Sequence, residues 1–313
     1  MESWGVMREK PLFITYIIMF LVMIVWGLNV VLVKVLVHEF PTITMTAFRV
    51  MLAGLVNMLI VLIARKMKKM TKREWGYILL STLLGVILHH FFLAKGLVLT
   101  EASNTVLILA LSPVTTFILA ALLLGDRLTK WRFTGIVLAF IGVVFIQGGG
   151  SFGFTLGELY VFIAMFVQAL SFIYIKKVSD TLDSIQITAF MLLIGSFGLL
   201  AVGLTMEPGR TGEMLDGTLF HYFIFLISAV LATAIGHVIF NGAIQRIGAG
   251  QAAIFNNFVP FFGLVSAAIF LDEKIYWYQA FGFIFIVLGV LFGSGYVESY
   301  WLRSPRRKKQ GSN

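Results

Sequence analysis

The amino-acid sequence predicts an all-α integral membrane protein in which ten transmembrane helices form two inverted five-helix repeats around a central cavity. First, 59% of its 313 residues are hydrophobic and only 12% are charged, whereas soluble domains carry about 25% charged residues. Second, the apolar residues fall into ten segments that approach the roughly 20 residues a helix needs to cross a bilayer. Third, the second half of the chain repeats the pattern of the first.

The ten predicted spans follow one another with short connections. They are residues 12–37, 42–64, 75–98, 102–124, 132–147, 157–176, 184–206, 219–241, 248–271 and 276–297. All are continuously apolar and lack the alternation of β-barrel strands, so we expect helices. The first span follows Arg8 and Lys10 like a signal peptide. It is too long and has no small-residue cleavage site, so we expect it to stay uncleaved.

The basic residues predict that both chain ends are cytoplasmic, because cytoplasmic loops are enriched in Lys and Arg. In this orientation nineteen of them face the cytoplasm, namely Arg8, Lys10, Arg65, Lys66, Lys68, Lys69, Lys72, Arg73, Arg127, Lys130, Arg132, Lys176, Lys177, Arg246, Arg303, Arg306, Arg307, Lys308 and Lys309. The outer side has only Lys34, Lys95, Arg210 and Lys274. We therefore expect a multi-pass protein of the cytoplasmic membrane with a solvated basic tail (298–313). Contact of that tail with anionic lipid head groups is the alternative.

The composition also argues against several classes of function. Cysteine does not occur, which excludes disulfides, thiolate metal sites and cysteine nucleophiles. The net charge of +9 comes from loops and the tail, so we expect no nucleic-acid partner. There is no Gly-rich nucleotide loop or HExxH motif, and we expect no cofactor and no metal. The alternative to a transporter is a membrane enzyme or sensor that uses His89, His90 and His237.

The two halves of the chain align without a gap over about fifty residues at a shift of 147 positions, which places Pro113 on Pro260. We expect two five-span domains, 12–147 and 156–293, joined by a glycine-rich linker. Because each domain has an odd number of spans, the second domain has the opposite orientation in the membrane. Inverted repeats are typical of secondary transporters. Duplication without a role in transport is the alternative.

The paired prolines lie near the middle of the fourth and ninth spans. A proline in a helix removes one amide donor and frees the carbonyl four residues earlier, here those of Leu109 and Asn256. Free carbonyls at membrane depth are tolerated where they line a cavity or are buried in protein. Our hypothesis is that Pro113 and Pro260 produce two kinks that shape the cavity and act as bending points. A static bend is the alternative.

In their order and spacing, these segments resemble the EamA family of the drug/metabolite transporter superfamily. The segments that carry the resemblance are WGLNVVLVK (26–34), FRVMLAG (48–54), GLVLTEASNTVLILALSPVTTFILAALLLGDRLT (96–129) and GIVLAFIGV (135–143). The chain departs from the family pattern at Gly96 in place of Ala, at Asp126 in place of Glu, and at Gln168-Ala169 in place of Trp-Gly. These departures leave the fold unaffected and make the substrate harder to infer.

The resemblance implies ten helices in two inverted halves around a central cavity. It further implies a secondary transporter, not an enzyme, that works by alternating access. Its cargo would be small metabolites such as amino acids or related polar solutes, often moved outward. The expected partners are a small-molecule substrate and the lipid bilayer, with protons as the candidate coupling ion and uncoupled diffusion as the alternative.

Histidines are the first candidates for transport, because polar groups inside a bilayer are costly and need a reason. Thr233, His237 and Asn241 lie four residues apart on the eighth span, as one polar stripe. His237 aligns with His90, and His89 is its neighbour. Imidazole titrates near neutral pH, so the paired histidines would bind substrate or take up protons. The alternative is that each bonds a backbone carbonyl between packed helices.

Amides and hydroxyls form a second group of candidates. Trp26 and Asn29 share a face of the first span, and Gln168, Ser171 and Tyr174 repeat that arrangement on the sixth. Such groups donate and accept hydrogen bonds, which suits polar solutes. The alternative is hydrogen bonding between helices.

Three more residues complete the predicted site. Asn104 and Asn256 lie on the fourth and ninth spans, and Arg49 lies inside the second. We expect Arg49 to act at an external gate or as a carbonyl clamp, with binding of an anionic substrate group as the alternative. No Asp or Glu lies deep in a span, which disfavours a carboxylate proton relay or a buried sodium site.

Overall fold

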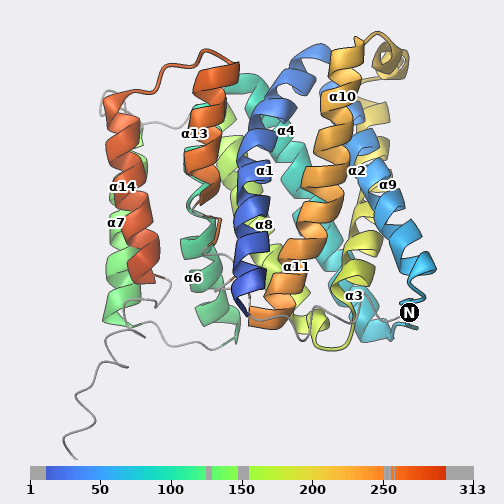
Figure 1. Ribbon diagram of the computed structural model, residues 1–313, viewed down its shortest axis with the longest axis horizontal. Coiled ribbons are helices and arrows are strands. Elements are labelled where there is room, and N and C mark those ends of the chain that lie inside the picture. The colour runs from blue at the N-terminus through green and yellow to red at the C-terminus, as the bar shows by residue number, and fades with distance from the viewer. Residues whose placement is uncertain are drawn as a thin grey trace, which may run out of the picture.

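The computed structural model is a bundle of helices that stand side by side (Figure 1). The structure describes residues 12–124, 129–146, 155–247, 249, 252, 255–256 and 258–293. Within these residues every regular element is a helix and no β-strand occurs, which confirms the all-α prediction for this part of the chain. The predicted tail, 298–313, lies outside the described residues.

The helices follow in chain order and keep the labels of Figure 1. They are α1 (Leu12–Glu39), α2 (Thr42–Ile63), α3 (Lys72–Thr82), η2 (Leu83–Leu88), α4 (His89–Leu99), α5 (Ala102–Leu109), α6 (Ser112–Leu124), α7 (Lys130–Ile146), α8 (Leu156–Ser179), α9 (Ser184–Met206), η3 (Arg210–Leu215), α10 (Leu219–Ile227), η4 (Ser228–Ile235), α11 (Gly236–Ile247), α13 (Phe258–Phe270) and α14 (Trp277–Gly293). The segments η2 and η4 are π-helical, and η3 is a short 3-10 helix.

Seven helical stretches in the described residues are long and apolar enough to cross a membrane. Two of them contain a π-helical segment: α3, η2 and α4 form one stretch, and α10, η4 and α11 form the other. The remaining predicted spans correspond to shorter described helices, α7 and α14 with 17 residues each and α13 with 13. The chain is therefore a helical protein with several candidate membrane spans.

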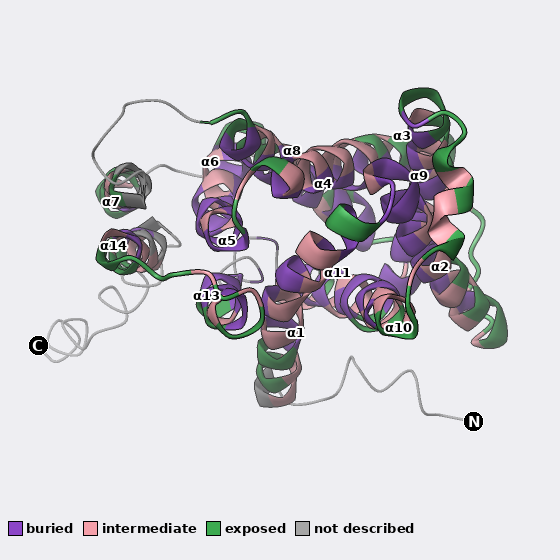
Figure 2. Cartoon of the chain, turned by 90° about the horizontal axis from the view of Figure 1, so that it is seen from above, coloured by how far each residue is buried: buried purple, intermediate pink, exposed green. Residues whose placement is uncertain are grey.

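The helices pack mainly in pairs around a central group (Figure 2). The most extensive contacts join α2 to α9 and α7 to α14. In the view from above, the α7 and α14 pair lies at one edge, beside α6 and α13. Helices α1, α4, α8 and α11 contact one another near the middle. Each of these four helices contacts two of the others, so that together they form the centre of the bundle.

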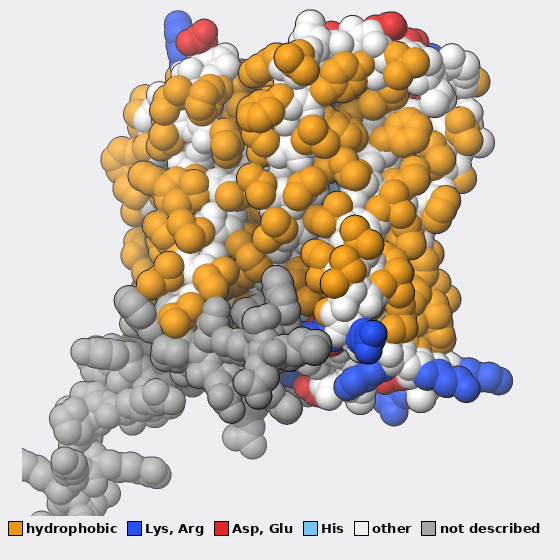
Figure 3. All heavy atoms as spheres, turned by 45° about the vertical axis from the view of Figure 1, so that its right-hand side comes forward, with side chains coloured by type: hydrophobic (Ala, Val, Ile, Leu, Met, Phe, Trp, Pro, Cys, Tyr) orange, Lys and Arg blue, Asp and Glu red, His pale blue; other side chains and the backbone are white. Residues whose placement is uncertain are grey.

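The exterior is apolar across the middle of the molecule. In Figure 3 hydrophobic side chains cover a broad band, and Lys and Arg side chains gather at its lower end. Leu59 on α2 and Phe197 on α9 are each 58% exposed. An apolar band of this kind suits hydrocarbon, whereas in water it would promote aggregation.

The side chains of two glutamates accept hydrogen bonds from the first backbone amides of helices that lie far away in the sequence. Glu207, which is buried, accepts hydrogen bonds from the amides of Ile43 and Thr44 at 3.0 and 2.9 Å, at the start of α2. Glu273 accepts from the amides of Ala102 and Ser103 at the start of α5, both at 2.9 Å. A carboxylate there satisfies orphan amides and complements the helix dipole. Both contacts therefore join distant parts of the chain.

Candidate functional site

A cavity of about 120 Å³ lies among the central helices. Its lining comes from α1, α2, α4, α8, η4 and α11, from the junction of α5 and α6, and from the start of α13. The lining residues are Trp26, Asn29, Val30, Val33, Arg49, His89, His90, Leu93, Leu97, Leu109, Ser112, Met165, Gln168, Phe172, Ala232, Thr233, His237, Asn256 and Val259. Both halves of the chain thus contribute to one site.

The structure brings most of the predicted polar residues to this cavity. Those that line it are Trp26, Asn29, Arg49, His89, His90, Gln168, His237 and Asn256. Among the described residues, no Asp or Glu lines the cavity. The described lining therefore combines a largely apolar surface of aliphatic and aromatic side chains with several polar groups and one cationic residue, Arg49.

Four predicted residues do not line it and bond to neighbouring helices instead. Asn241 donates to the hydroxyl of Thr188 at 2.8 Å. Asn104 accepts from Gln279 at 2.9 Å and donates to Glu158 at 3.3 Å. The other two contacts are Ser171 Oγ with the Ser81 carbonyl, at 3.3 Å, and the ring of Tyr174 with that of Tyr77, at 6.2 Å. These contacts correspond to the alternative of bonding between helices.

The three histidines share one hydrogen-bonding arrangement. The Nδ1 atoms of His89, His90 and His237 each lie 3.0 Å from a backbone carbonyl, those of Ala164, Val86 and Thr233. A carbonyl only accepts, so each Nδ1 carries the proton, and Nε2 of the neutral ring is an acceptor.

The histidine rings also lie close together at the cavity. The ring centroids of His89 and His90 are 4.9 Å apart, and those of His90 and His237 are 6.1 Å apart. The indole of Trp26 lies 5.3 Å from the His237 ring. Each of the three histidines thus both bonds a backbone carbonyl and lies at the cavity, although the sequence presented these two roles as alternatives.

Each of the two paired histidines follows a π-helical segment. The segment η2 ends at Leu88, just before His90, and η4 ends at Ile235, just before His237. Within η4 the Thr233 hydroxyl donates to the Ser228 carbonyl at 2.9 Å. Short π-helical segments inside α-helices occur frequently at functional sites, because they change which residues face the interior. Neither π-helical segment was predicted from the sequence.

Arg49 is buried at the cavity with only neutral partners. It is 3% exposed, and its Nη1 donates to Thr233 Oγ1 at 2.8 Å and to Ser228 Oγ at 3.4 Å. The Ser228 hydroxyl in turn donates to Asn29 Oδ1 at 2.5 Å. Arg49 thus bonds hydroxyls of η4, not the backbone carbonyls that a clamp would use.

Two amide oxygens at the cavity lack a hydrogen-bond partner. Gln168 Oε1 and Asn256 Oδ1 are both buried acceptors for which the described residues supply no donor. Such groups are rare in folded proteins and mark a missing water, ion or ligand group. A water or a ligand group that donates hydrogen bonds would satisfy both acceptors.

The prolines lie at helix starts and not at kinks within continuous helices. Helix α5 ends at Leu109, and Pro113 lies in the first turn of α6, where its missing amide is tolerated. Pro260 is the third residue of α13. The Asn256 carbonyl accepts from the Val259 amide at 3.1 Å. The expectation that this carbonyl is freed is therefore wrong, because a short turn supplies another donor.

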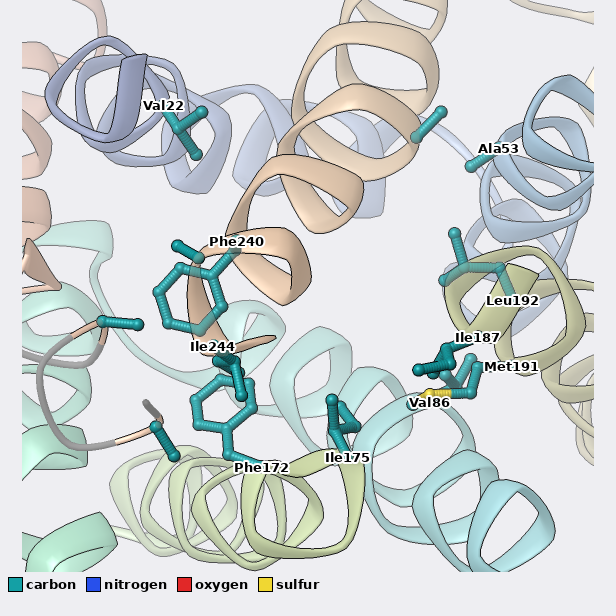
Figure 4. Packing of buried hydrophobic residues seen from close by; sticks show 14 of the residues in the cluster. Val22, Ala53, Val86, Phe172, Ile175, Ile187, Met191, Leu192, Phe240 and Ile244 are labelled. Atoms are coloured by element: carbon teal, nitrogen blue, oxygen red, sulfur yellow. The ribbon is translucent and has the colours of Figure 1, made fainter. Parts of the chain in front are cut away.

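A hydrophobic cluster, shown in Figure 4, lies next to the cavity on the side where α1 begins. On α1 the lining begins at Trp26, and Val22, one turn earlier, is buried in the cluster. On α11 His237 lines the cavity and Phe240 belongs to the cluster. The rings of Phe240 and Phe172 lie 5.0 Å apart. These packed side chains therefore lie beside the cavity, on the side where α1 starts.

Sequence reasoning missed Ser112 and Ser228 and did not include Thr233 among the site residues. Ser112 lines the cavity directly before Pro113, so the proline was the available signal. Ser228 acts through its bonds to Arg49 and Asn29 and carries no sequence signal. In the described residues, no group of three or more His, Cys, Asp or Glu is arranged to hold a metal ion.

Comparisons with known proteins found one family model, similar transporters and a solved structure of similar fold. The model of the EamA-like transporter family matches residues 13–148 and again residues 155–294. The uncharacterized transporter YyaM of Bacillus subtilis is 28% identical over 277 residues, which cover 85% of this chain and 89% of the relative. A probable amino-acid metabolite efflux pump of Escherichia coli is 28% identical over 302 residues, which cover 93% of this chain and 97% of the relative. A solved protein structure aligns with a TM-score of 0.66 at 17% identity, over 90% of this chain and 98% of that one.

Proposed function

The chain belongs to the EamA-like transporter family, and we propose that it is a secondary transporter that exports small metabolites across the cytoplasmic membrane by alternating access. The observation that carries this proposal is the central polar cavity, which both halves of the chain line. Amino acids and related polar solutes are the proposed cargo, in keeping with the name of the Escherichia coli relative. The membrane enzyme or sensor that the sequence left open has no support from the comparisons.

The proposed architecture is ten helices in two inverted repeats, 12–147 and 156–293. Paired features of the described residues support it. A π-helical segment precedes His90 in the first half and His237 in the second. The predicted fourth span is interrupted after Leu109, and a turn at Asn256 precedes α13 in the other half. These interruptions would serve as the bending points that the prolines suggested.

The proposed mechanism opens the cavity first to one side of the membrane and then to the other. The cluster around Phe172 and Phe240 is the barrier at the end where α1 begins. For the cavity to open at that end, helices α1, α8 and α11 must separate there. With both chain ends in the cytoplasm, as the distribution of Lys and Arg favours, this barrier is cytoplasmic.

A flux measurement on purified protein tests the transport proposal. The protein is reconstituted into liposomes loaded with a mixture of amino acids and related metabolites, and their loss is followed by mass spectrometry. We expect selective loss of some compounds relative to protein-free liposomes. An imposed pH gradient changes that rate if protons are coupled and leaves it unchanged if they are not. Retention of every compound, with or without the gradient, would contradict transport of this class.

A further inference from the structure

Arg49 is a cation inside the protein without a counter-ion. Among the described residues no carboxylate lies within 4.0 Å of its nitrogen atoms. The hydroxyl protons of its two partners are used elsewhere: Ser228 donates to Asn29, and Thr233 donates to the Ser228 carbonyl. Both hydroxyls therefore present lone pairs to the guanidinium and orient it, but they do not neutralise its charge.

The buried carboxylates of the protein have other partners. Glu207 accepts from the amides at the start of α2, and Glu158 accepts from Asn104 and from the amide of Thr155. A buried charge without a counter-ion is strongly unfavourable. Such a cost is retained where a ligand supplies the missing charge, and a guanidinium fits a carboxylate with two parallel hydrogen bonds.

A second set of groups in the same cavity requires donors. Gln168 Oε1 and Asn256 Oδ1 are buried acceptors for which the described residues supply no donor, and Asn256 is only 9% exposed. They belong to α8 and to the turn before α13, whereas Arg49 belongs to α2. The lining also includes Phe172 and Met165, which are apolar. The cavity thus offers one cation, two unpaired acceptors and an apolar wall.

We propose that the cavity binds a small metabolite that carries one carboxylate, held by Arg49, and an N–H or O–H donor group, held by Gln168 and Asn256. This inference rests on the proposed transport function and assigns its substrate class. Among the described lining residues there is no Asp or Glu, so the cavity offers no carboxylate to an organic cation. A volume of about 120 Å³ suits a small metabolite, whereas sites for drug-sized ligands measure roughly 300–1000 Å³.

Thermal stabilisation of the purified protein tests the ligand class, because a ligand that binds only the folded state raises the melting temperature. The probes are the proteinogenic amino acids, each with its amide, which lacks the carboxylate, and its deaminated acid, which lacks the ammonium group. We expect stabilisation by at least one amino acid, a weaker effect of the deaminated acid and none of the amide. Stabilisation by amides, or by no carboxylate at all, would overturn the proposal.

Variants of Arg49 separate ligand binding from a structural role. We expect Arg49→Gln to lower the affinity for the stabilising amino acid by roughly 30-fold or more, because a charged double hydrogen bond is lost. The ligand-free variant should melt at the same or a higher temperature, since a buried unpaired charge has been removed. Arg246→Gln is the matched control, because Arg246 also bonds a hydroxyl, that of Thr15 at 2.6 Å, but lies outside the cavity lining.

Variants of Gln168 and Asn256 test whether these residues hold the donor group of the ligand. Gln168→Leu and Asn256→Leu should lower affinity for the amino acid by roughly tenfold each and leave affinity for the deaminated acid unchanged. Equal effects on both compounds would contradict the assigned donor contact. A lower melting temperature of ligand-free Arg49→Gln with unchanged affinity would show that Arg49 is only structural.

Flux in liposomes distinguishes failure of this inference from failure of the transport proposal. Binding of carboxylates without any flux contradicts transport and leaves the ligand class intact. If amides or cations are transported and carboxylates are not, the proposed ligand class is wrong and the transport proposal stands.

Discussion

The side chains around the cavity differ in how many of their donor and acceptor groups already have a partner within the protein. Each histidine has its Nδ1 bonded to a carbonyl, which fixes the ring and leaves Nε2 for a ligand or a proton. Asn241 is bonded to another helix. Side chains with one group fixed and another available are the strongest candidates for contact with substrate.

We expect His90→Ala and His237→Ala each to lower flux by roughly tenfold without preventing membrane insertion, because each removes a cavity group that is held in place. The measurement is the initial flux in liposomes between about pH 5.5 and about pH 8, the range in which imidazole titrates. If a histidine carries the proton, its variant also loses the pH dependence of the wild type.

The matched control for these variants is His221→Ala, since His221 lies outside the cavity lining, 3.2 Å from Glu39. Full transport by both cavity variants over this pH range would show that the histidine hypothesis is wrong.

The helices approach one another closely where glycine is present. A Cβ atom added at Gly54 on α2 would lie 2.7 Å from the Leu193 amide nitrogen on α9. The contact is with backbone, which cannot move aside without separating the two helices. The α2–α9 pair therefore depends on this position.

We predict that Gly54→Ala lowers the free energy of unfolding by about 1–3 kcal/mol, because it overpacks the α2–α9 contact. Gly76→Ala is the control: nothing lies within 4 Å of a Cβ atom at Gly76 on α3. Since alanine favours a helix over glycine by about 1 kcal/mol, that variant should be slightly more stable. Unfolding in detergent solution measures both, and equal stability of the two variants would refute the close contact.

The carboxylate of Glu207 joins the end of α9 to the start of α2. Glu207→Gln replaces one acceptor oxygen by an amide nitrogen that cannot accept, so we expect a loss of about 1–3 kcal/mol in the same unfolding experiment. Glu213→Gln is the control, because the Arg210–Glu213 pair is exposed and such pairs contribute little. If Glu207→Gln lowers the free energy of unfolding as little as Glu213→Gln does, the contact of Glu207 with the start of α2 does not stabilise the protein.

The orientation of the whole molecule is open to a direct test because the chain has no cysteine. A single introduced cysteine is then the only site for a membrane-impermeant maleimide. We predict that Lys69→Cys, between α2 and α3, is protected in intact cells and reacts after permeabilisation. Asp216→Cys, after η3, should react in intact cells. Both positions are exposed, and the reverse pattern would invert the proposed topology.

The helical fold was predictable from the sequence because a bilayer imposes its requirements along the chain. A span has to be apolar over about 20 residues and satisfy its own backbone, so composition alone gives helices and their order. The membership of the site was less predictable. Gln168 lines the cavity, whereas Ser171 and Tyr174, on the same predicted face, do not.

The physical reason is helix geometry. At 3.6 residues per turn, positions three and six residues after Gln168 are rotated from it by about 60° and 120°, and Asn241 is rotated by about 80° from Thr233. On α8 the other lining residues, Met165 and Phe172, are rotated from Gln168 in the opposite direction, by about 60° and 40°. The π-helical segments before His90 and His237 shift the faces further. The sequence thus determined the apolar helices, the duplication and the family. Only the packing of helices from both halves decided which polar side chains meet, and that no counter-ion of Arg49 lies among the described residues.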